Sequence, residues 1–241
     1  MISTFANPHR FMKFTQWMGP ALLGLGIVIL VWGLYQGLVL APADYRQGDA
    51  ARIMFVHVPA AMMCMGVYAF MVLASLSSLI WKHALADIAA KSAAPVGAVF
   101  TLICLITGSL WGKPIWNTWW EWDARLTSVL VLFFIYLGYM AIWSALETPQ
   151  KAGRAAAILC LVGAVNIPII KWSVDWWSTL HQQASITLTK ISLPADYIVP
   201  LFTMLAAYGV LFGALVIMNM RAEIFSRRAE MLVQRQYASM D

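Results

Sequence analysis

Six stretches of apolar residues, each of about the length needed to cross a lipid bilayer, are separated by short polar segments along the chain. Within hydrocarbon every backbone N–H and C=O must be satisfied inside the segment, so these stretches are expected to be α-helices. The sequence therefore predicts an all-α, polytopic membrane bundle with about six transmembrane helices. The predicted spans are Pro20–Leu40, Phe55–Ile80, Ala93–Leu110, Leu126–Leu146, Ala155–Ile170 and Tyr197–Met218.

Composition supports lipid as the main solvent of this chain. Only 11% of its 241 residues are charged, where a soluble domain has about 25%. Mean hydropathy is +0.73. We therefore treat residues 1–241 as a single integral membrane domain. The three cysteines all fall inside apolar runs and are predicted to be packing residues rather than disulfide or metal ligands: Cys64, Cys104 and Cys160.

Helix packing is suggested by two glycine pairs, Gly33/Gly37 and Gly209/Gly213, whose GxxxG spacing lets helices approach closely. Three prolines are expected near helix ends, where a missing N–H costs least. They are Pro95, Pro168 and Pro200.

The distribution of charge predicts the orientation in the membrane. Segments on the side of the N-terminus hold 10 of the 16 basic residues and a net charge of +5, whereas the other side is neutral. The positive-inside rule then places both termini in the cytoplasm, together with a tail at 219–241. The outer loops would be residues 41–54, 111–125 and 171–196. Topology thus accounts for the basic character of the chain, and no nucleic-acid partner is needed.

The second outer loop is unusually rich in tryptophan, with five of the 12 indoles between residues 111 and 122. An interfacial aromatic belt is one explanation, but a belt spreads its indoles over all helix ends. Flat indoles gathered in one segment could instead stack on a flat apolar macrocycle and donate their N–H groups. Asp123 and Arg125 end the loop. They could form a local salt bridge, or Arg125 and Lys113 could meet carboxylates such as haem propionates.

Two of the four histidines fall on the outer side of the predicted topology. His57 begins the second span and His181 lies in the third outer loop, whereas His9 and His83 lie on the cytoplasmic side. Neutral imidazole is the usual axial ligand of haem iron, so one histidine on each side of a macrocycle could hold it against the indoles. A respiratory cytochrome b would need histidines in mid-helix, and the sequence has none there.

At these residues the chain resembles a known superfamily. The stretch 111–128 is similar to the tryptophan-rich WWD motif of haem-handling membrane proteins. The segments APADYRQG from Ala41, HVPAA from His57 and WSTLHQ from Trp177 resemble its CcmC branch, which serves system I cytochrome c maturation. The resemblance extends over most of the chain, from the first predicted helix to the last.

The resemblance implies a role and a set of site residues. Such proteins bind haem b at the periplasmic face of the bacterial inner membrane and present it to the chaperone CcmE, in a complex with CcmA, CcmB and CcmD. By this similarity His57 and His181 would be the axial ligands of the haem iron. The platform would consist of Trp116, Trp119, Trp120, Trp122 and Asp123, and Arg125 also belongs to the motif.

Two other functions remain open on the sequence. A haem transporter should show polar residues within its helices, but only Asn166, expected near the outer end of the fifth span, and Asn219 stand out. A haem lyase would form a covalent bond, yet no general acid or base is seen beyond the histidines. Whether the chain is an enzyme is therefore left undecided.

Overall fold

The structure, a computed structural model, describes residues 8–83, 85–177, 179–181 and 192–239. Regular structure over this part of the chain is helical, apart from an isolated bridge between Asp44 and Gly48. The helices are α2 (Pro8–Phe14), α3 (Met18–Tyr35), α4 (Met54–Trp81), α5 (Ala86–Trp116), α6 (Ala124–Ala145), α7 (Pro149–Gly163), α8 (Asn166–Trp176) and α9 (Ala195–Ala238). A π-helical turn, η1 (Gln36–Leu40), continues α3, and a 3-10 turn, η2 (Asp49–Ile53), leads into α4.

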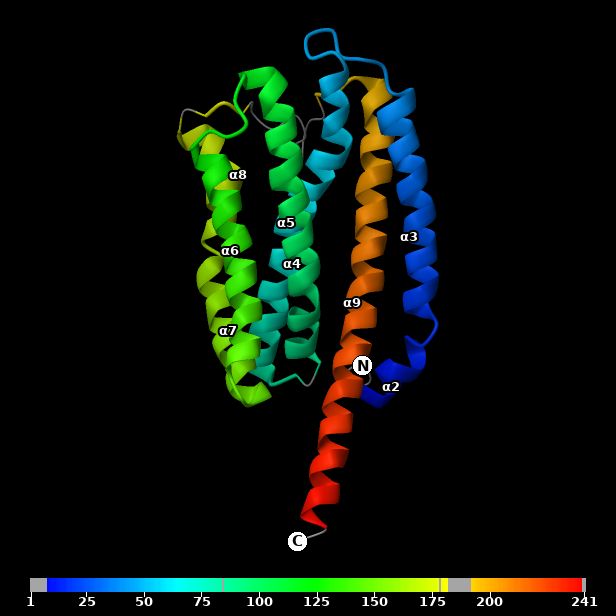
Figure 1. The fold of residues 1–241 in the computed structure, drawn as a ribbon, viewed down its shortest axis with the longest axis vertical. Helices are drawn as coiled ribbons and strands as arrows, with labels where there is room; N and C mark the ends of the chain where they lie inside the picture. Colours follow the sequence, from blue (N-terminus) through cyan, green and yellow to red (C-terminus); the bar gives the residue numbers. More distant parts are fainter. Residues whose placement is uncertain (1–7, 84, 178, 182–191, 240–241) are drawn as a thin grey trace.

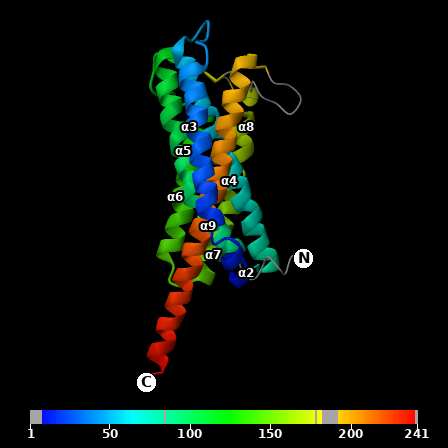
Figure 2. The same cartoon turned by 90° about the vertical axis from the view of Figure 1, so that its right-hand side faces the viewer.

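The prediction of six spanning helices is confirmed for the described residues. Six helical segments are long and apolar enough to cross a membrane, and α7 and α8 together form the fifth. Figure 1 shows α4 and α5 at the centre, with α6, α7 and α8 on one side and α3 and α9 on the other. In a view at right angles, α4 and α9 diverge as they approach the end of the bundle where α2 lies (Figure 2).

The third span is longer than predicted at both ends. Its helix α5 runs from Ala86 to Trp116, so only residues 117–123 separate it from α6, and the expectation of a loop over 111–125 was wrong in its first half. Asp87 in the first turn and Lys113 in the last complement the helix dipole, which favours helix beyond the apolar stretch. Pro95 consequently lies well inside the helix rather than near its end.

The fifth span is broken between α7 and α8. Pro168 has no N–H to bond the carbonyl of Ala164, and Ile167 N donates to that carbonyl instead, at 3.1 Å. Asn166 begins α8 at this break and has ten further helical residues after it, so its expected place near the outer end was wrong. Its buried side chain donates to the carbonyl of Ser128 on α6, at 2.8 Å. The break thus ties the fifth span to the fourth.

The last helix extends far beyond its predicted end at Met218. Helix α9 continues to Ala238, so most of the segment from 219 onward, expected as a tail, prolongs the helix past the rest of the bundle (Figure 1). In the third predicted outer loop, α8 reaches Trp176, and residues 178 and 182–191 lie outside the described part.

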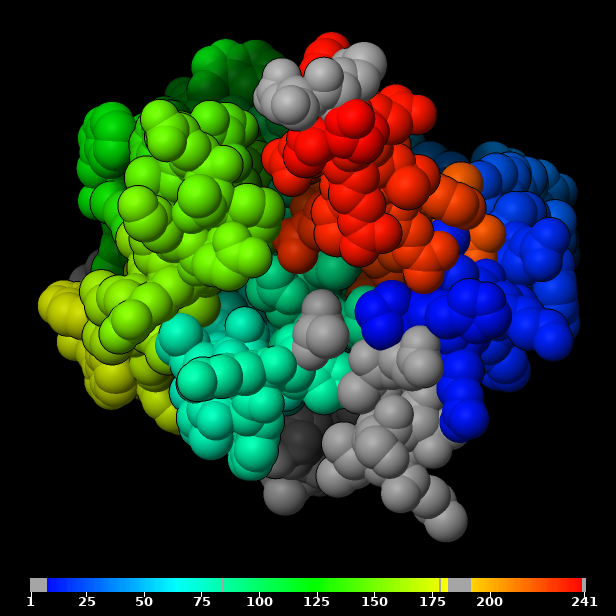
Figure 3. Space-filling model, turned by 90° about the horizontal axis from the view of Figure 1, so that it is seen from below, coloured from blue at the N-terminus to red at the C-terminus, as the bar shows by residue number. Residues whose placement is uncertain are grey.

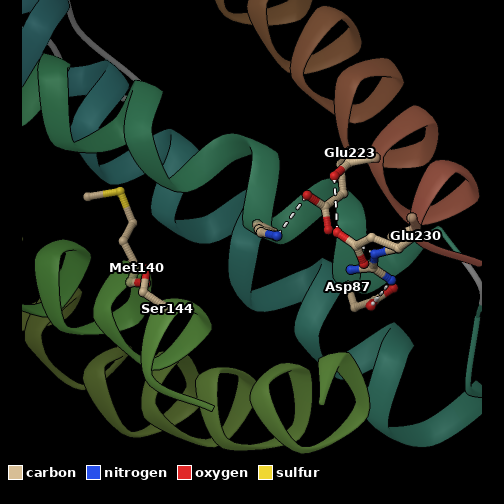
Figure 4. A network of polar contacts seen from close by, with 8 residues as sticks. Asp87, Met140, Ser144, Glu223 and Glu230 are labelled. Carbon is tan, nitrogen blue, oxygen red and sulfur yellow. Dashed lines mark hydrogen bonds and ion pairs between the residues drawn. The ribbon is translucent and has the colours of Figure 1, made fainter. Parts of the chain in front are cut away.

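The end of the molecule from which α9 projects is held together by polar contacts. Residues of α2 lie beside α9 there (Figure 3). Glu223 of α9 accepts from Lys91 Nζ at 2.7 Å and from Arg227 Nε at 2.8 Å. Arg227 also reaches Asp87 at 3.2 Å, beside Glu223 (Figure 4). Both cations lie over the ring of Trp143. These contacts fix α9 against α5 and α6 at this end.

The antiparallel pair of α3 and α9 meets along glycines of α3 at seven-residue spacing. A Cβ added to Gly19, Gly26 or Gly33 would lie 2.7–2.8 Å from side-chain atoms of Met218, Leu211 or Met204, which follow the same spacing on α9. The predicted pair Gly33/Gly37 is used in packing, since Gly37 lies against Phe55. The pair Gly209/Gly213 has no neighbour within 4 Å of the added atom among the described residues, so that expectation was wrong.

The close contact of the α3 glycines with α9 predicts that a larger residue lowers stability only at the positions that face α9. In Gly26→Val, the new Cβ would lie 3.3 Å from the backbone N of Leu211 and would clash with the Leu211 side chain. We expect this overpacking to lower the free energy of unfolding by about 1–3 kcal/mol. Gly24→Val is the matched control on the same helix, because nothing lies within 4 Å of its added Cβ. Thermal unfolding of the detergent-solubilised variants measures the difference. Equal stability of the two variants would contradict this packing.

Candidate functional site

The residues singled out in the sequence come from segments that meet at one end of the bundle, opposite the projecting part of α9 (Figure 1). His57 lies in the first turn of α4, Trp116 is the last residue of α5, and Asp123 is the N-cap of α6. His181 follows the end of α8. The tertiary structure thus gathers residues that are distant in sequence.

His57 is held by helix α5. Its Nδ1 lies 3.1 Å from the hydroxyl of Thr107, and its ring meets the edge of the Trp111 ring, with centroids 5.7 Å apart. The Thr107 hydroxyl donates to the carbonyl of Ile103 at 2.6 Å. Because Nδ1 is engaged in this contact, Nε2 is the nitrogen that remains to coordinate a metal.

His181 is held in a parallel way by a carboxylate. Its Nδ1 lies 3.0 Å from Oδ2 of Asp123, and its ring packs edge-on against Trp116, with centroids 4.9 Å apart. Burial lowers the pKa of His181 below its ordinary value, although Asp123 opposes the shift. The neutral imidazole, the form that binds a metal, is therefore favoured at neutral pH.

Asp123 has a second task at the start of α6. Its Oδ1 accepts from the backbone N of Leu126 at 2.7 Å, which caps the helix. Among the contacts of the described residues, Asp123 forms no direct ion pair with Arg125, so the local salt bridge considered from sequence is not the arrangement found. Arg125 instead donates to the carbonyl of Lys171 at 3.3 Å.

The tryptophans of residues 117–123 form the surface of the site. Trp119 is 55% exposed and Trp122 is 74% exposed, and the ring of Trp120 meets that of Trp122 edge-on. Two hydroxyls fix the backbone: Ser109 donates to the carbonyl of Trp119 at 2.6 Å, and Thr118 donates to that of Trp120 at 2.8 Å. The exposed indoles of Trp119 and Trp122 therefore lie on a short, internally bonded segment.

Two buried donors at this site have no partner among the described residues. They are Nε1 of Trp120 and Nε of Arg125. A buried donor without a hydrogen bond is costly, and such groups in a native structure point to a missing acceptor such as a ligand or water. Acceptors such as carboxylate oxygens would satisfy both.

Sequence reasoning missed the residues behind His57. Thr107 contacts its imidazole, and a Cβ on Gly108 would come to 3.0 Å from its Cε1. Trp111 was seen only as part of the aromatic run, yet its indole N–H donates to Gln47, in the segment predicted as the first outer loop, at 2.9 Å. Nothing in the sequence pairs these positions with His57, because the contact depends on how α4 and α5 are rotated against each other.

Fold and site together define a polytopic helical membrane protein with a two-histidine, tryptophan-rich face at one end of its bundle. Comparison with known proteins gives the family. The family model described as "Heme exporter protein C" (CcmC) matches residues 1–235, and the chain belongs to this family.

Similar proteins named heme exporter protein C support this assignment. The chain is 52% identical over 236 residues to that of Bradyrhizobium diazoefficiens, covering 98% of this chain and 89% of the relative. It is 47% identical over 216 residues to that of Escherichia coli K12, covering 90% and 87%. It is 44% identical over 238 residues to that of Paracoccus denitrificans, covering 96% and 97%.

Proposed function

We propose that this protein binds haem b at the periplasmic face of the bacterial inner membrane and presents it to a CcmE-type chaperone for cytochrome c maturation. It would do so in a complex with CcmA, CcmB and CcmD, as the resemblance to the CcmC branch implies. The observation that carries the proposal is the pair His57 and His181. Each has its Nδ1 engaged by a hydrogen-bonding partner, which leaves both Nε2 atoms for an iron.

The residues present fit a haem. Haem supplies an iron that takes two axial ligands, an apolar macrocycle and two carboxylates. His57 and His181 would hold the iron, and the exposed indoles of Trp119 and Trp122 would cover the macrocycle. The unpartnered donors of Trp120 and Arg125 suit the propionates. The role of the protein is then to fix orientation and tune the iron, leaving one edge open for a partner.

Conduction of haem across the bilayer is the less favoured function. A conducting path needs polar groups that are free to line it. Two of the buried tyrosines within the spans are already bonded to backbone, since Tyr68 donates to the carbonyl of Cys160 at 2.9 Å and Tyr136 to that of Cys64 at 2.7 Å. Asn166 is likewise bonded to Ser128. These groups stabilise helix packing, which favours presentation at one face.

The optical spectrum of the purified protein tests the proposal, because it reports whether haem is bound and how its iron is ligated. Replacing Trp119 and Trp122 together with alanine should lower haem retention while the protein still inserts. Stacking is worth about 0.5–1.5 kcal/mol for each aromatic pair, so each single change should be mild.

The matched control is the double variant Trp32→Ala, Trp81→Ala. These indoles are 53% and 71% exposed, close to the values of Trp119 and Trp122, but lie on α3 and at the far end of α4. Full haem occupancy in the Trp119, Trp122 variant would show that these indoles do not bind haem and serve only as anchors at the membrane interface. Transfer of haem from the loaded protein to purified chaperone tests the presentation step directly.

A further inference from the structure

We propose that Thr107 is a positioning residue for His57, and that it makes the two axial ligands unequal, with His57 the weaker. The inference rests on the proposed haem site and deepens it. It concerns a residue of α5 that no sequence pattern singled out.

The hydrogen bonds around Thr107 set the tautomer of His57. The Thr107 hydroxyl has one hydrogen, and its shortest contact is to the carbonyl of Ile103 at 2.6 Å, which can only accept. With that hydrogen committed, Oγ1 can only accept from His57 Nδ1 at 3.1 Å. This contact requires the proton on Nδ1 and leaves the lone pair on Nε2.

The ring of His57 is also confined in space by the same helix. An added Cβ at Gly108 would lie 3.0 Å from Cε1 of the imidazole, so the glycine leaves just enough room for it. Trp111 closes the next turn with an edge-on contact at an interplanar angle of 74°. Rotation of the imidazole about its own axis is thereby restricted, and Thr107 selects the orientation.

The partner of His181 differs in charge. Asp123 is a carboxylate that is 9% exposed, and it lies 3.0 Å from His181 Nδ1. A carboxylate behind a ligating histidine raises its basicity, and a neutral hydroxyl does so much less. His181 is therefore the stronger donor to the iron and His57 the weaker. An added neutral ligand should displace His57 first, by exchange of one lone pair for another without any change in oxidation state.

The test is Thr107→Val, which keeps the branched shape but removes the acceptor. In the haem-loaded protein we expect the imidazole concentration that displaces His57 to fall about tenfold, because loss of a partner behind a ligand typically costs about 10–100-fold. The midpoint potential should shift upward, since a freed imidazole donates less to the iron. Thr107→Ser should restore both values, because it retains the hydroxyl.

Thr101→Val is the matched control. Thr101 lies on the same helix and its hydroxyl makes the same type of bond, to Gly97 at 2.7 Å, with no imidazole partner among its described contacts. Its imidazole displacement and potential should match those of the native protein. If Thr107→Val matches them too, or if Thr107→Ser behaves like Thr107→Val, the positioning role is overturned while the haem site stands. A native protein without six-coordinate haem would instead overturn the proposed function itself.

Discussion

Replacing His57 and His181 together with alanine should remove nearly all haem from the purified protein. We expect occupancy to fall at least about tenfold, because loss even of a group behind a metal ligand costs about 10–100-fold in affinity. Each single variant should keep a weakly held, five-coordinate haem, since one imidazole and the indole surface remain. The absorption spectrum and the ratio of haem to protein measure both effects.

Two variants and one added ligand sharpen this experiment. His9→Ala and His83→Ala should leave the spectrum unchanged, because these histidines lie at the opposite end of the bundle, in α2 and between α4 and α5. Free imidazole should partly rescue each single variant by filling the vacated axial position. A native spectrum in either single variant would contradict the paired-ligand model, and would show that the replaced histidine has a structural role.

An all-or-none result is expected from cysteine labelling across the membrane. Glu121 is exposed in the segment between α5 and α6, so Glu121→Cys should react with an impermeant thiol reagent applied to the periplasmic side of intact cells. Asn117 in the same segment is less suitable, because its φ of 58° is one that cysteine rarely adopts. The three native cysteines are buried, which keeps the background low.

The opposite end supplies the control for the labelling. Gln234 is exposed on the projecting part of α9, and Gln234→Cys should react only after the cells are opened. The two positions lie at opposite ends of the bundle, so the two results must be opposite. Labelling of Glu121→Cys from the cytoplasmic side alone would place the candidate site in the cytoplasm and remove the basis for presentation to a periplasmic chaperone.

The break in the fifth span and the extent of α5 show where sequence patterns were insufficient. Hydropathy located both spans, but it could not see that Pro168 would stop a helix within an apolar stretch and leave Asn166 bonded to α6. It also ended α5 too early, because the charge of Lys113 lowers hydropathy without interrupting backbone hydrogen bonds. Trp116 consequently ends a helix, where a loop was predicted.

The sequence by itself determined the class of the protein, its six spans and the concentration of tryptophan near one membrane face. These features can be read from the hydropathy and composition of each segment alone. In lipid, each apolar stretch must form its backbone hydrogen bonds within itself, whatever its neighbours do. Only the tertiary structure decided that Thr107 lies behind His57, 50 residues away, and that Asp123 lies behind His181, 58 residues away. Such hydrogen bonds depend on the rotation and depth of one segment against another. Close packing, such as that of the α3 glycines against α9, sets how the helices are rotated and shifted against each other, and hydropathy does not predict it.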